Sequence, residues 1–141
     1  MLIAALLVAA GVIYTVLGLL HAVFTLLDER HPRRLAPDDP AVTAGMQTAK
    51  VRLSRGAITM WEAWISFNLT HSLAAIMFGV GCIVFAAWFG VVIFPRWVPF
   101  LLSGVSAVFA LIGLRYWFGV PRAGCVIATL CLFAASCLYA L

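Results

Sequence analysis

Charged side chains are scarce in this chain. Asp, Glu, Lys and Arg make up only 10% of its 141 residues, whereas 65% are apolar, and the mean hydropathy is +1.12. From Leu2 to Leu27 no charged residue occurs at all. Because about 20 such residues in a helix cross a hydrocarbon core roughly 30 Å thick, this composition excludes a water-soluble globular fold and predicts that the chain is surrounded by lipid.

The sequence also lacks the motifs of common enzyme and metal sites. It contains no nucleophile-base-acid arrangement, no glycine-rich phosphate loop, no zinc-ligand spacing and no nucleic-acid-binding motif. None of the cysteines forms a C-x-x-C pair, and all of them lie in apolar runs, which predicts small buried apolar residues: Cys82, Cys125, Cys131 and Cys137. We therefore expect no nucleic-acid partner, and the sequence leans away from an enzyme.

The apolar residues form four long runs, which predict an all-α integral membrane protein with a single transmembrane domain over 1–141. The predicted spans cover about 2–27, 59–92, 98–118 and 123–141. The last two connections are short, and short connections place neighbouring helices antiparallel, so an up-down-up-down four-helix bundle is expected. The first run has no basic start and no small-residue end, so we expect it to be a retained span rather than a cleaved signal peptide.

The loop 28–58 is the only long polar segment. Asp39 followed by Pro40 is typical of an N-cap and a first helical residue, and apolar residues then recur at helical spacing. These features predict a short helix lying at the membrane interface, with an irregular loop as the alternative. The loop holds six of the nine Lys and Arg residues, so it should be cytoplasmic, with both termini periplasmic in a bacterial inner membrane.

Polar residues inside the first two spans fall on one face of each predicted helix. In lipid such groups need partners, so these faces should point inward. From the depth of each residue we expect His21 to pair with Asn68 and Tyr14 to pair with His71. The cluster predicts a small pocket for an amphiphile such as a lipid, quinone or sterol-like molecule. The candidate ligand-binding residues are Tyr14, His21, Trp64, Asn68, His71 and Ser72.

Other interpretations of the same residues stay open. The histidines can simply be satisfied structural residues of the bundle. His21 and His71 can instead ligate a b-type haem or a metal, although no third or fourth ligand is evident and no cofactor is otherwise predicted. His71 with Tyr14 can also serve as the acid-base pair of an intramembrane isomerase-like enzyme. Glu62 fits a capping box with Thr59 better than it fits catalysis. A homo-oligomer or a partner membrane protein is compatible with all of these.

The segment from Trp61 to Leu73 resembles an uncharacterised family of small bacterial four-span membrane proteins with an FN-x-(S/T)-H-S motif in the second span. Here the motif is Phe67-Asn68-Leu69-Thr70-His71-Ser72, and it follows a loop containing Pro37-Asp38-Asp39-Pro40. Gly18-x-x-His21 and Arg115-Tyr116-x-Phe118-x-x-Pro121 fit the same pattern. The resemblance implies the four-span architecture and singles out Asn68, His71 and Ser72 without implying a reaction.

Overall fold

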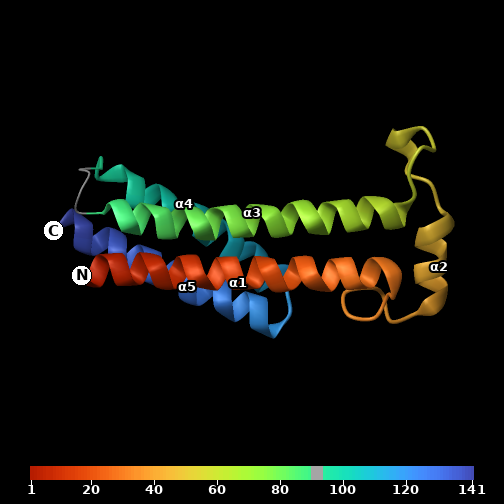
Figure 1. Cartoon of the computed structure of the whole chain (residues 1–141), viewed down its shortest axis with the longest axis horizontal. Helices are drawn as coiled ribbons and strands as arrows, with labels where there is room; N and C mark the ends of the chain where they lie inside the picture. Colours follow the sequence, from red (N-terminus) through yellow and green to blue (C-terminus); the bar gives the residue numbers. More distant parts are fainter. Residues whose placement is uncertain (90–93) are drawn as a thin grey trace. The chain divides into compact units, whose positions relative to one another are not determined.

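The computed structural model describes residues 1–89 and 94–141, and within these ranges it is helical and has no strand (Figure 1). Its elements are α1 Leu2–Arg30, α2 Pro40–Thr48, the 3-10 helix η1 Arg52–Ser54, α3 Met60–Trp88, α4 Trp97–Tyr116 and α5 Gly119–Ala140. Four of them, α1, α3, α4 and α5, are long and apolar enough to cross a membrane. The expected all-helical fold with four membrane-spanning-capable helices is therefore confirmed for the described residues.

The helix ends differ from the predicted spans for identifiable reasons. α1 continues to Arg30, beyond the apolar run, because the first helix-breaking residue is Pro32. α5 begins at Gly119, so the predicted turn at 119–122 lies inside its first turn, where Pro121 needs no hydrogen-bonded N–H. The end of the second predicted span, residues 90–92, lies outside the described residues.

Two predicted helix starts are confirmed in detail. The Asp39 side chain accepts a hydrogen bond from the backbone N–H of Ala41, and Pro40 is the first residue of α2. At the start of α3, the Thr59 backbone N–H and hydroxyl both donate to Glu62 Oε2, while the Glu62 N–H donates to Thr59 Oγ1 at 3.1 Å. Glu62 is therefore a capping residue, as its spacing from Thr59 predicts.

The contacts divide the chain into two compact units. The first unit comprises Met1–Leu17 and Ala75–Leu141, and the second unit comprises Gly18–Ala74. In the first unit α4 and α5 pack against each other. The second unit holds the remaining parts of α1 and α3 together with the polar loop and α2. We describe each unit by itself.

Burial in the helices reverses the pattern of a water-soluble protein. Many of the buried side chains are small or hydroxylated, such as Ala10, Ser106 and Ala128, while large apolar residues such as Leu111 cover the exposed faces. Such continuous apolar surface is typical of helices in contact with lipid. The inward faces predicted for the first two spans are confirmed, since their residues are buried or half-buried. Of the cysteines, Cys137 is exposed, contrary to the predicted burial.

In the first unit the backbones of α1 and α3 touch at two glycines. A Cβ atom added to Gly79 would lie 2.5 Å from the carbonyl oxygen of Gly11, and one added to Gly11 would lie 2.6 Å from the carbonyl oxygen of Gly79. A side chain at either position would therefore force the two helices apart. Gly79 forms a small-x-x-x-small pair with Ala75 in the sequence, a pattern that allows such a close approach of two helices.

Candidate functional site

In the second unit a hydrogen bond joins α1 to α3 at the predicted polar cluster. His21 Nε2 lies 2.9 Å from Asn68 Oδ1, which confirms the expected pair. The amide nitrogen of Asn68 donates to the Trp64 carbonyl oxygen at 2.7 Å. Because a carbonyl can only accept, this second bond fixes which end of the amide faces His21. Asn68 Oδ1 must then accept a hydrogen bond from the Nε2–H group of His21, and in the neutral ring the lone pair lies on Nδ1.

His71 lies next to this pair. The ring centroids of His21 and His71 are 5.6 Å apart, with the ring planes nearly perpendicular. The His71 ring also stacks on Phe67, with centroids 6.4 Å apart and planes inclined by 12°. The cluster therefore places two imidazoles side by side, half-buried, with an aromatic wall from α3.

The hydroxyls around the imidazoles are already engaged with their own helices. Ser72 Oγ donates to the Asn68 carbonyl oxygen at 2.8 Å, and Thr25 Oγ1 donates to the His21 carbonyl oxygen at 2.8 Å. Such bonds satisfy buried hydroxyls without a cross-helix partner. The Trp64 indole stacks on Trp61 at 5.0 Å between centroids. Ser72 and Trp64 thus surround the cluster, in which the acceptor nitrogen of the His21 ring is Nδ1.

Tyr14, the remaining candidate, belongs to the first unit. Its hydroxyl lies 2.8 Å from Ser106 Oγ of α4, and its ring meets the Phe78 ring edge-on at 4.9 Å between centroids. The predicted pair of Tyr14 and His71 would join residues of different units, so it stays a prediction. The hypothesis of an isomerase-like enzyme depends on that pair and also stays a prediction. Ser106 was not predicted as a partner of Tyr14, although Ser106 forms a small-x-x-x-small pair with Ala110 in the sequence.

The Tyr14 contact belongs to a chain of hydroxyls that links three helices of the first unit. Ser106 Oγ lies 2.7 Å from Thr129 Oγ1 of α5, and Thr129 Oγ1 donates to the Cys125 carbonyl oxygen at 2.8 Å. Because each hydroxyl has one proton, Ser106 must donate to Thr129, and Tyr14 must donate to Ser106. A second pair, Ser103 Oγ and Ser136 Oγ at 2.8 Å, also joins α4 to α5.

No group of three His, Cys, Asp or Glu side chains able to hold a metal ion occurs among the residues that the structure describes. A metal at His21 and His71 would thus have two protein ligands there, the number that a bis-histidine haem uses. Haem binding stays a prediction.

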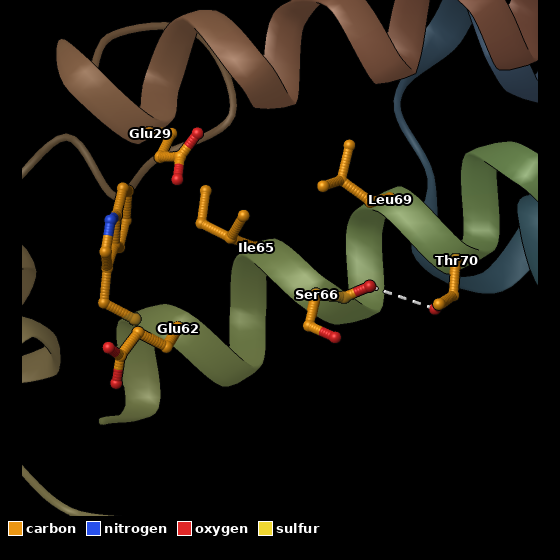
Figure 2. Close-up of a pocket in the computed structure, with 7 residues that line it drawn as sticks. Glu29, Glu62, Ile65, Ser66, Leu69 and Thr70 are labelled. Carbon is orange, nitrogen blue, oxygen red and sulfur yellow. Dashed lines mark hydrogen bonds between the residues drawn. The ribbon is translucent and has the colours of Figure 1, made fainter. Parts of the chain in front are cut away.

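Two shallow clefts open on the second unit, and neither is lined by the six candidate residues. One, of about 370 Å³, has a floor of apolar side chains with acidic and hydroxyl groups around it (Figure 2). Its lining residues are Trp61, Ile65, Leu69, Glu29, Glu62, Ser66 and Thr70. In Figure 2, Ile65 and Leu69 point from α3 toward α1, and Glu29 points from α1 toward α3. The other cleft, of about 380 Å³, is lined by Leu27, His31, Arg33 and Arg34.

Near the cleft lined by Leu27, His31, Arg33 and Arg34, Asp28 of α1 is a buried carboxylate whose role was not predicted from the sequence. Its exposed fraction is 0%, and its two oxygens accept hydrogen bonds from the successive backbone N–H groups of residues 33–36, at 2.6 to 3.2 Å. The carboxylate thereby replaces the partners that these amides would find in regular structure. The one available signal is an acidic residue at the end of an apolar helix, just before Pro32.

In comparisons with protein-family models, with curated proteins and with solved structures, nothing matched this chain. The resemblance to small four-span membrane proteins therefore stays a prediction.

Proposed function

We propose that this chain is a small polytopic membrane protein of binding or accessory type, whose polar cluster of His21, Asn68 and His71 holds the polar group of a small amphiphile. The observation that carries the proposal is the bond between His21 Nε2 and Asn68 Oδ1 at 2.9 Å, with the amide anchored on the Trp64 carbonyl. This arrangement commits one imidazole nitrogen and leaves the other, Nδ1 of His21, as an acceptor within the half-buried cluster.

An imidazole acceptor inside a membrane favours a ligand that brings a hydrogen-bond donor. A hydroxyl or N–H group supplies that donor, and the remaining apolar body of the ligand suits the aromatic surroundings of Phe67 and Trp64. Lipids, quinols and sterol-like molecules share this chemistry. Because no charge needs to be buried, such a ligand avoids the large desolvation cost of an ion at this depth.

The proposal includes a topology. We place α1, α3, α4 and α5 as an antiparallel up-down-up-down bundle in a bacterial inner membrane, with the loop at 31–59 cytoplasmic and both termini periplasmic. The excess of basic residues in that loop supports the orientation. We place α2 at the interface, where the apolar residues Val42 and Met46 would face lipid. Reaction of single introduced cysteines with an impermeant thiol reagent in intact cells tests this topology.

Ligand binding is tested by purifying the full chain in a mild detergent and identifying retained amphiphiles by mass spectrometry. The wild type and the control Thr70→Ala should retain the same molecule, because Thr70 lies on the exposed side of the same helix. Asn68→Leu should lose the ligand. The His21 Nε2–H group then has no amide acceptor, so nothing fixes Nδ1 as the nitrogen that accepts a hydrogen bond from the ligand. Retention of the same ligand by Asn68→Leu, or its absence from all three proteins, would refute binding at this cluster.

The presence of two imidazoles in one cluster also supports a second candidate, a b-type haem protein that uses His21 and His71, with the two rings moving apart to admit the haem between them. Their ring centroids are 5.6 Å apart. The visible absorption spectrum of the protein, purified from cells supplied with a haem precursor, tests this candidate. A Soret band that disappears in His71→Ala supports it, and a wild-type spectrum without that band excludes it.

A further inference from the structure

The cleft beside the end of α1 combines positive charge with an apolar side chain. We name it the arginine cleft, and its lining consists of Leu27, His31, Arg33 and Arg34 around about 380 Å³. Leu27 belongs to the last two turns of α1, where an apolar span gives way to polar loop. A helix that crosses a membrane ends at the depth of the lipid headgroups, so the cleft opens at that depth.

The backbone that carries the arginines is held in place. The buried Asp28 carboxylate binds the backbone N–H groups of Arg33, Arg34 and the next two residues. The oxygens of Asp28 are therefore occupied by amides, and the guanidinium groups do not need to neutralise them. A loop fixed in this way loses little conformational entropy when a ligand binds.

The side chains of the cleft remain available for an anion. The Arg34 guanidinium carbon lies 5.5 Å from the centroid of the Phe24 ring, which directs this side chain along α1. Both arginines and His31 are exposed, and within the described part of the chain neither arginine forms an ion pair with a carboxylate. Of the nearby acids, Asp28 is bound by amides, and Glu29 lines the other cleft. The cleft thus presents planar N–H donors that no acidic group uses.

We propose that the arginine cleft is a binding site for an anionic glycerophospholipid. Its phosphate is bound by Arg33, Arg34 and His31, and an acyl chain lies along Leu27 and the apolar outer face of α1. Guanidinium groups bind phosphate oxygens in pairs, whereas a zwitterionic lipid offers the same phosphate with a neighbouring cation that the arginines repel. This site is separate from the cluster at His21 and Asn68, and it does not depend on a ligand there.

Nanodiscs of defined composition test the proposal with the full chain. The protein is reconstituted in phosphatidylcholine containing a minor fraction of phosphatidylglycerol, extracted in mild detergent, and analysed by native mass spectrometry for bound lipid. The double variant R33Q/R34Q removes the proposed ligands. R52Q/R55Q is the matched control, because it removes the same charge from exposed arginines of the same loop that do not line the cleft.

We expect the wild type and R52Q/R55Q to retain phosphatidylglycerol in preference to phosphatidylcholine, and R33Q/R34Q to lose that preference by about tenfold. Equal losses in both double variants would overturn the site, since the loop would then attract anionic lipid only through its net charge. Equal thermal unfolding of the variants in detergent separates loss of binding from loss of folding. Displacement of the bound lipid by millimolar inorganic phosphate would also overturn the proposal, because the cleft would then recognise a soluble anion.

Discussion

The two units of this chain satisfy their polar groups in different ways. The first unit uses hydroxyls, and its chain from Tyr14 through Ser106 and Thr129 ends on a backbone carbonyl. The second unit uses an imidazole-amide pair and a buried carboxylate, and we propose that groups beside both of them bind a further molecule. In lipid, hydroxyls can be fully satisfied within the bundle, whereas ionisable groups are costly to bury and are commonly associated with function. The difference predicts that the first unit is structural and that the second unit binds ligands.

The largest effect that would sharpen this comparison is expected from Asp28→Ala. The substitution removes the acceptor of four successive backbone N–H groups, and hydrogen bonds to a charged group are each worth about 1.5 to 3 kcal/mol. We expect a loss of about 3 kcal/mol or more and rapid amide exchange over residues 33–36. Hydrogen exchange of the first unit should be unchanged, and Asp38→Ala is the control. Equally faster amide exchange throughout the chain would contradict the division into two separately stabilised units.

The next effect is expected at the glycine contact of the first unit. In Gly79→Ala the added methyl group would lie 2.5 Å from the Gly11 carbonyl oxygen and 2.5 Å from Thr15 Oγ1, so the helices must separate. Overpacking of this kind costs about 1 to 3 kcal/mol. Gly81→Ala is the matched control, because nothing lies within 4 Å of its added Cβ. Reversible unfolding in mixed micelles measures the difference, and equal stability of both variants would contradict the close approach.

A smaller effect is expected from Ser106→Ala. It removes the shared partner of Tyr14 and Thr129, and hydrogen bonds between membrane helices contribute on average about 0.6 kcal/mol each, so a loss of about 1 kcal/mol is expected. Tyr14→Phe should cost less, because Ser106 keeps its bond to Thr129. If Tyr14→Phe instead lowered the stability more than Ser106→Ala, Tyr14 would have a role beyond this chain of hydroxyls. That result would support Tyr14 as a ligand-binding residue.

The smallest effect is expected from Glu62→Gln. The amide can still accept one hydrogen bond from Thr59, but it loses the charge that favours a helix start, so only the first turn of α3 should fray. Faster amide exchange confined to residues 60–63 would be the signature. Glu29→Gln, at an exposed residue without a capping role, serves as the control and should leave this exchange unchanged.

Hydrophobic runs and capping patterns predicted the helices well because both are local. The bond between His21 and Asn68 was also predictable, since helical rise places the two residues at similar depth in consecutive antiparallel spans. The partner of Tyr14 could not be predicted in this way, because it lies on α4. Which face of α4 turns toward α1 does not follow from helical periodicity. The role of Asp28 was hidden for a related reason: it needs the irregular path of residues 33–36, which no periodicity describes.

The direction of the hydroxyl chain in the first unit has a consequence for transport. Every proton in the chain points toward the Cys125 carbonyl, which cannot accept a proton covalently and pass it on. The row of hydroxyls therefore cannot pass a proton beyond the Cys125 carbonyl, although its exchangeable O–H groups follow one another as they do in proton-conducting paths. Conduction of protons through this part of the bundle would require water molecules or a different set of side chains.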